Sequence, residues 1–188
     1  MFKSLISWYI KDQIKQKAVD SLGIDASTFD SVAGDALDSI IMWVAKNTET
    51  EEGKAWFVEA LKKDHDGSML DDVMWLINQE DKGSNILDHI LGSKKSEIEA
   101  KVAESSGVDT EKATSMFNTI ALIFMQMMWK QANGGSLDLE SIAGLLQQEK
   151  KEVATNSTNP MIAMFLDTDG DGDVDGSDLM WMASKLLN

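Results

Sequence analysis

The sequence predicts an all-α protein, a helical bundle that forms a single domain over residues 1–188. Long runs of alternating polar and apolar residues, which would indicate strands, are absent. Two similar segments each read as an amphipathic helix that ends at a glycine. Apolar residues also recur at three- and four-residue steps, which is the spacing of one helix face. That spacing is clearest at Phe29, Val32, Ala33, Ala36, Leu37, Ile40 and Ile41.

The first predicted helix covers the N-terminal residues and differs in charge from the rest of the chain. Its apolar stripe consists of Phe2, Leu5, Ile6, Tyr9 and Ile10, and its lysines are Lys3, Lys11, Lys15 and Lys17. A basic amphipathic helix can lie on an anionic membrane or on an acidic partner. We favour the simpler alternative, in which the helix covers its own acidic domain.

An internal duplication with an offset of 84 residues organises the chain. Residues 14–25 read IKQKAVDSLGID, and residues 98–109 read IEAKVAESSGVD. In each copy a glycine suits the left-handed end of a helix, and an aspartate two residues later suits the cap of the next helix. We therefore expect two related repeats, at about 11–78 and 95–188. The alternative is that both segments have the same helix-turn-helix pattern without common ancestry.

Three segments are expected to interrupt the helices. Lys82–Ser84 reads as a short link between the repeats, and Gly134-Gly135 reads as a turn. Gln147–Asn159 is polar and is predicted to be a surface loop inside an insertion of the second repeat.

The acidic segment Asp64–Asp72 leads into an apolar helix that carries Met-Trp near its start, as does the C-terminal segment. Aligned as a calcium loop, it would place Lys62 at the first ligand position, and a lysine does not bind calcium. We interpret the segment as a helix entry capped by Asp66 or Ser68, with Asp71 and Asp72 favouring the helix N-terminus. A degenerate calcium loop is the alternative.

The strongest chemical signal is the segment DTDGDGDVDGSD at residues 167–178. On the twelve-residue EF-hand loop, its first three acidic residues fall at positions 1, 3 and 5, and Gly172 falls at position 6, where the chain turns sharply. Positions 7 and 9 supply a carbonyl and a carboxylate that often acts through water. The predicted Ca²⁺ ligands are Asp167, Asp169, Asp171, Asp173, Asp175 and Asp178.

Asp178 departs from the commonest EF-hand loop, which has a glutamate at position 12. Its shorter side chain reaches the ion less readily with both oxygens, so the preference for calcium over magnesium is open. An aspartate here resembles dockerin-type loops, although a dockerin would carry a second loop nearby. The alternative is an acidic turn that only caps the helix after Ser177 or Asp178 and binds nothing. We favour the metal site, because six carboxylates in twelve residues repel one another without a cation.

Composition and motifs argue against several other functions. The net charge is −15 and all 17 basic residues are lysines, which disfavours nucleic-acid binding. Cysteine is absent, and His65 and His89 have no spaced partner for zinc. No nucleophile elbow or phosphate loop is present, so we expect no enzyme. We also expect no transmembrane segment and see no signal peptide, which slightly favours the cytoplasm.

Methionine and tryptophan are unusually frequent, with 12 and 6 residues. Met125, Met127 and Met128 lie with Trp129 on a helix that is apolar on nearly all sides. We expect these side chains to fill the core. The alternative is a methionine-rich groove that binds a partner helix, or that opens when calcium binds.

Residues 86–113 read ILDHILGSKKSEIEAKVAESSGVDTEKA and are followed by an apolar helix. The order of a His-containing helix, a glycine turn, a Ser-Glu-Ile-Glu start and a Ser-Gly-Val turn resembles the YidB-like family of bacterial proteins of unknown function. The likeness covers residues 85–130 and extends more faintly over 15–77. It implies a helical bundle of bacterial origin. It supplies no activity or site residues, so the calcium loop stands on its own sequence.

We therefore predict a calcium-binding structural or protein-interaction module. Calcium would order the loop and the last helix, Ser177–Leu187, and dock Trp181 on the core. The alternative is a self-assembling scaffold in which calcium is incidental and methionine-rich helices form the subunit contacts. A weak site would stay empty at cytosolic calcium concentrations, so an extracellular location competes with the cytoplasm.

Overall fold

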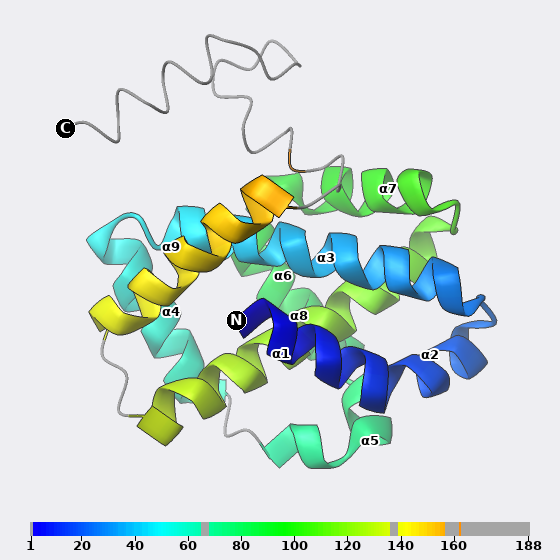
Figure 1. The fold of residues 1–188 in the computed structure, drawn as a ribbon, viewed down its shortest axis with the longest axis horizontal. Helices are drawn as coiled ribbons and strands as arrows, with labels where there is room; N and C mark the ends of the chain where they lie inside the picture. Colours follow the sequence, from blue (N-terminus) through cyan, green and yellow to red (C-terminus); the bar gives the residue numbers. More distant parts are fainter. Residues whose placement is uncertain (1, 65–67, 136–138, 157–161, 163–188) are drawn as a thin grey trace, which may run out of the picture.

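The computed structural model describes residues 2–64, 68–135, 139–156 and 162 (Figure 1). Every regular element in these ranges is helical, which confirms the predicted all-α class. The α-helices are α1 (Phe2–Tyr9), α2 (Lys15–Leu22), α3 (Ala26–Asn47), α4 (Glu51–Asp64), α5 (Val73–Ile77), α6 (Glu80–Leu91), α7 (Lys95–Ser106), α8 (Thr110–Gly135) and α9 (Leu139–Asn156). A π-helical turn, Ile10–Ile14, joins α1 to α2, and 3-10 turns occupy Ser68–Asp71 and Gly92–Lys94.

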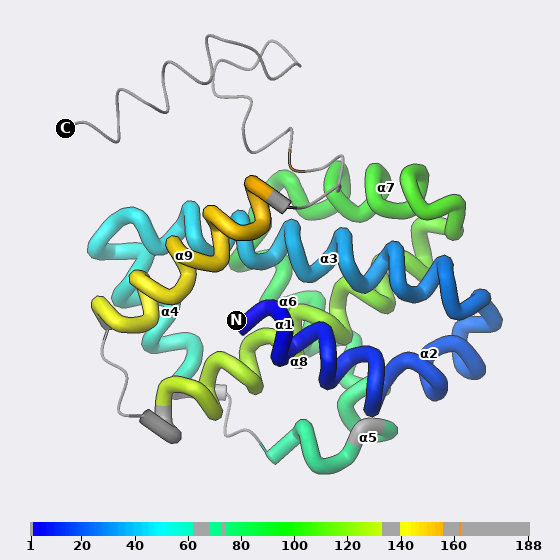
Figure 2. The backbone as a smooth tube through the Cα atoms, viewed as in Figure 1, coloured from blue at the N-terminus to red at the C-terminus, as the bar shows by residue number. Residues whose placement is uncertain are grey.

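The two longest helices, α3 and α8, form the centre of the bundle. They pack against each other, and α8 also contacts α4, α6 and α7. Figure 2 shows α1 in front of α8, and α9 crosses the end of α3. Each residue from Ile120 to Met125 is at most 2% exposed. Met127 and Met128 are buried as well, so the prediction that these methionines fill the core is confirmed.

The two glycine turns that suggested a duplication have the same local geometry. α2 ends at Gly23 and α7 ends at Gly107, with φ angles of 62° and 68°. Asp25 then accepts hydrogen bonds from the backbone N–H groups two and three residues later, both at 2.9 Å. Asp109 accepts one from the N–H three residues later at 3.0 Å. Glycine suits the left-handed position and aspartate suits the helix cap, as predicted.

The predicted link at Lys82–Ser84 is wrong, because these residues belong to α6. Gly83 is buried against α8, and a Cβ atom on it would lie 2.1 Å from the carbonyl oxygen of Asn118. This glycine therefore permits close packing of two helices and does not mark a chain reversal.

The predicted surface loop at Gln147–Asn159 is also wrong as far as the structure describes it, since α9 continues to Asn156. Residues 157–159 lie outside the described ranges. Glutamine, glutamate and lysine are good helix formers, so their polarity alone was misleading. Residues at three- and four-residue steps along α9 are buried: Ile142, Leu146, Glu149 and Val153.

The N-terminal helix covers its own domain, which is the alternative that the sequence favoured. Its buried residues follow a strict four-residue spacing through the π-helical turn: Phe2, Ile6, Ile10 and Ile14. Leu5 was predicted for the same stripe, but it is 45% exposed. It lies one residue from Ile6, about 100° around the helix, and so points away from the core.

Candidate functional site

All six predicted calcium ligands, Asp167, Asp169, Asp171, Asp173, Asp175 and Asp178, lie outside the described residues. The residue that leads into the loop is described. Ile162 is 5% exposed and belongs to the hydrophobic core. Asp167 follows five residues later, and five extended residues span at most about 18 Å.

The second acidic segment, Asp64–Asp72, is described at both ends, while residues 65–67 are not. Asp72 caps α5, because its carboxylate accepts a hydrogen bond from the backbone N–H of Trp75 at 3.0 Å. The exposed Asp71 lies 3.7 Å from the ammonium group of Lys130. A capping role was predicted for Asp66 or Ser68, but the 3-10 turn before α5 shifts the start of that helix to Asp72.

No group of three or more histidine, cysteine, aspartate or glutamate side chains in the described ranges is placed to hold a metal ion. His89 is exposed on α6, and its ring stands edge-on to Trp56 with centroids 5.7 Å apart. This contact is an aromatic packing interaction.

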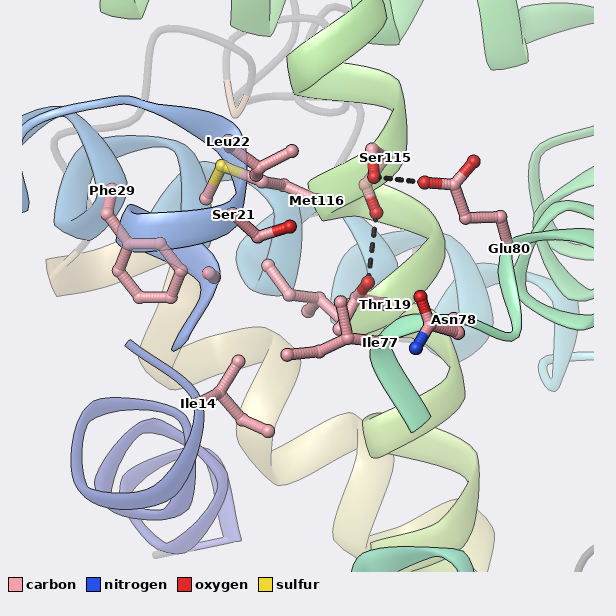
Figure 3. Close-up of a pocket in the computed structure, with 12 residues that line it drawn as sticks. Ile14, Ser21, Leu22, Phe29, Ile77, Asn78, Glu80, Ser115, Met116 and Thr119 are labelled. Atoms are coloured by element: carbon pink, nitrogen blue, oxygen red, sulfur yellow. Dashed lines mark hydrogen bonds between the residues drawn. The ribbon is translucent and has the colours of Figure 1, made fainter. Parts of the chain in front are cut away.

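A small cavity lies where α2, α3, α5 and α8 meet, and the π-helical turn supplies one wall through Ile14 (Figure 3). Its volume is about 80 Å³, well below the several hundred Å³ of a pocket for a drug-sized ligand. The apolar lining consists of Ile14, Ala18, Leu22, Phe29, Ile77, Met116 and Ile120, and the polar lining of Ser21, Asn78, Glu80, Ser115 and Thr119. A space of this size holds a few water molecules at most.

The polar rim of this cavity is tied together by hydrogen bonds (Figure 3). The hydroxyl of Ser115 donates to the carboxylate of Glu80 at 2.5 Å, and the hydroxyl of Thr119 donates to the backbone carbonyl of Ser115 at 3.0 Å. A serine that is activated as a nucleophile has an adjacent base that is itself held by a third group. The residues that line this cavity include no histidine or lysine.

Two carboxyl groups elsewhere in the bundle have a raised pKa. Burial raises the pKa of Glu99 on α7, while a hydrogen bond from the Thr114 hydroxyl at 3.2 Å acts in the opposite direction. Burial also raises the pKa of Asp35 on α3, where Ser105 donates a hydrogen bond at 3.3 Å. These two acids lie on different helices, and neither lines the cavity. Glu80 is the one acid in its lining, so no pair of acids suited to acid–base chemistry is assembled there.

Comparison with known families matched residues 4–131 to a family described as "Bacterial protein of unknown function (DUF937)". The match covers more than half of the chain. It ends within α8, so α9 and the predicted calcium loop lie beyond it. Searches of curated proteins and of solved structures found no match. No helix of the described ranges is long and apolar enough to cross a membrane.

Proposed function

The chain belongs to the bacterial family of unknown function DUF937, and we propose that it is a calcium-binding structural or protein-interaction module. In this proposal the helical bundle is the stable body, and the EF-hand-like loop at residues 167–178 is the responsive part. Bound Ca²⁺ orders the loop and the last helix, Ser177–Leu187. The ordered helix then packs against the bundle through Trp181.

The observation that carries this proposal is the spacing of six aspartates close behind a buried residue. Asp167, Asp169 and Asp171 alternate as the first ligands of a calcium loop do, and Gly172 follows where the loop turns. Ile162 fixes the chain in the core five residues before the loop. Because the loop is tethered to the core at short range, its ordering can stabilise the bundle.

The charge of the protein adds a second argument. Because the net charge is −15, the calcium-free acidic loop repels the helical bundle to which it is joined. One calcium ion cancels two of the loop's negative charges and binds the rest in place. Calcium therefore weakens the repulsion at the same time as it fixes the loop.

We also propose that the two halves of the chain are related by duplication, and that the calcium loop is the counterpart of Asp64–Asp72. The matching turns at Gly23 and Gly107 support this relationship. We further propose that the chain is related to the YidB-like proteins. The family that matches is described only as DUF937, so this relationship rests on the sequence resemblance.

The alternative function is a self-assembling scaffold in which calcium is incidental. Such a scaffold cannot form subunit contacts through Met125, Met127 and Met128, because these side chains are buried inside the bundle. A scaffold would need the large apolar side chains that are exposed in the described ranges, namely Leu5, Trp8, Met74 and Trp75. Light scattering with and without chelator separates the two functions, since a scaffold keeps its mass when calcium is removed.

The test of the proposed function is thermal unfolding at increasing free calcium. We expect the stability to rise with the logarithm of free calcium, by about 2.7 kcal/mol at one hundred times the Kd. Asp171→Ala should abolish this rise, and Asp20→Ala, which removes an exposed carboxylate from α2, should preserve it. A melting temperature that ignores calcium, or that responds equally in Asp171→Ala, contradicts the proposal.

A further inference from the structure

We propose that an exposed groove on α1 is the docking site of the chain's own C-terminal segment, residues 163–188. The inference rests on the proposed function, because it is the calcium-loaded loop that presents the last predicted helix to the groove. It goes further by naming the surface that this helix covers.

The groove, called here the α1 groove, has a volume of about 480 Å³ and runs along the side of α1 that faces away from the core. Its lining residues are Lys3, Ser4, Ser7, Trp8, Lys11 and Glu152. All but Glu152 come from α1 and the π-helical turn, and Glu152 comes from the neighbouring α9. Figure 1 shows α1 on the near side of the bundle, with α9 beside it.

Apolar surface borders this groove. Trp8 is 58% exposed and Leu5 is 45% exposed, and the two lie three residues apart on the same side of α1. The opposite side of the helix is fully used by the core, because Phe2 and Ile6 are at most 4% exposed. An indole and a leucine side by side in water form an apolar surface that gains by being covered.

The charges at the groove select the kind of segment that covers it. Lys11 has no carboxylate partner among the described residues. Lys3 lies 2.5 Å from the carboxylate of Asp38, and Glu152 is the one acid in the lining. In a chain with a net charge of −15, the groove therefore offers the ammonium group of Lys11 next to exposed apolar side chains. It is complementary to a segment that is acidic and then apolar.

The C-terminal segment has that order of residues. Its six aspartates at 167–178 are followed by Leu179, Met182 and Leu186, which share one face of a predicted helix, while Trp181 lies on the other side of that helix, where it can pack against the bundle beside the groove. The aspartates match Lys11, and the apolar face matches Trp8 and Leu5. No basic residue lies between Ile162 and the end of the loop, so nothing in the loop opposes this match.

The tether favours this occupant over a free partner. The segment starts from the buried Ile162, which follows Glu152 of the groove lining by ten residues. The last predicted helix begins at Ser177, fifteen residues after Ile162, and a ligand joined by a connection of this length has an effective concentration in the millimolar range. A free partner at micromolar concentration would need an affinity about a thousandfold higher to compete. The α1 groove is thus covered when calcium is bound and open when calcium is absent.

The test is cross-linking within the full chain, which is favourable because the natural sequence has no cysteine. The variant Ser4→Cys/Ala183→Cys pairs the groove with the last predicted helix. The matched control Ser93→Cys/Ala183→Cys uses an exposed serine in the 3-10 turn between α6 and α7. With dilute protein and a short bismaleimide, we expect the groove pair to cross-link within one chain about tenfold faster than the control pair in calcium. Chelator should remove the difference.

Two further variants test the groove itself, and both change exposed side chains. Trp8→Ser and Lys11→Glu should each slow cross-linking of the groove pair severalfold, and the loop should still bind calcium, only more weakly, because docking and calcium binding are coupled. If calcium binds but both pairs cross-link at the same rate, the docking site is wrong and the proposed function stands. Faster groove cross-linking without any calcium binding supports the docking site and contradicts the proposed function.

Other occupants of the groove give distinct results. Cross-links between two chains would identify a second copy as the occupant and overturn the proposal. A membrane surface would be the occupant if two results were found together. The protein would sediment with vesicles of anionic lipid unless Trp8 were replaced by serine, and both cysteine pairs would cross-link at the same rate.

Discussion

The buried carboxylate of Glu149 on α9 accepts a hydrogen bond from the backbone N–H of Phe2 at 2.6 Å. It also accepts one from the N–H of Lys3 at 3.1 Å. These are free donors at the start of α1, where the helix dipole favours a negative charge. Glu149 is 2% exposed. A residue beyond the family match therefore fixes the first helix of the chain in place.

Replacing Glu149 by glutamine should weaken this cap. The amide keeps the size of the side chain, but it loses the charge and one of the two acceptor oxygens. We expect the free energy of unfolding to fall by about 1–2 kcal/mol, as for loss of a helix cap. Hydrogen exchange in α1 should also become faster. Glu140→Gln on the same helix removes an exposed carboxylate and should cost at most about 0.5 kcal/mol. Equal losses in both variants would contradict the cap.

Gly83→Ala should be strongly destabilising, because the added Cβ would lie 2.1 Å from the carbonyl oxygen of Asn118. The backbones of α6 and α8 must then separate, at a cost of roughly 2–3 kcal/mol. Gly34→Ala on α3 is the matched control, since its Cβ meets nothing within 4 Å. That control should gain about 0.5–1 kcal/mol from the higher helix propensity of alanine. Chemical denaturation measures the free energy of unfolding of both variants. An unchanged free energy of unfolding in Gly83→Ala would refute the close packing of α6 on α8.

Two glutamates on α7 should respond to pH with opposite signs. Burial raises the pKa of Glu99, so its ionised form opposes folding at neutral pH. Glu99→Gln should therefore be more stable than the natural protein at pH 7. The gain should shrink as pH falls through the raised pKa of Glu99 and should be lost below about pH 4, where the carboxyl is protonated in both folded and unfolded chains.

Glu97 is the control for this effect. Its hydrogen bond from Lys94, at 2.9 Å, lowers the pKa of Glu97, so its ionised form favours folding. Glu97→Gln should be slightly less stable than the natural protein at pH 7, and this loss should also shrink below about pH 4. Melting temperatures from pH 3 to 8 measure both variants. The same sign for the two variants would show that the environment of one carboxyl is misassigned.

Local signals made much of the fold predictable from the sequence. Gly23 and Gly107 end their helices in the left-handed conformation, and Asp25 and Asp109 cap the helices that follow. Each of these roles depends on a few neighbouring residues, and the sequence contains them all. The buried methionines of α8 were predictable for a similar reason, because a helix that is apolar on all sides is a core helix.

Contacts between distant segments were not predictable in this way. Gly83 looked like a link because glycine often marks a turn, and its packing against Asn118 depends on a helix 35 residues away. Glu149 looked like part of a polar loop, because the sequence does not show that the N–H groups of α1 lie next to it. In the candidate site, the calcium ligands follow from spacing alone, while the α1 groove became visible only when Leu5 and Trp8 were found exposed.

The most direct test of the central claim is a calorimetric calcium titration of chelator-stripped protein, with Asp171→Ala beside it. The account predicts one site for Ca²⁺ and no comparable site in Asp171→Ala, and a parallel titration with Mg²⁺ measures the selectivity that the short side chain of Asp178 leaves open. Two sites would point to a second calcium loop at Asp64–Asp72. No heat of binding, and no competition with a calcium indicator, would contradict the account and identify the acidic loop as a helix cap alone.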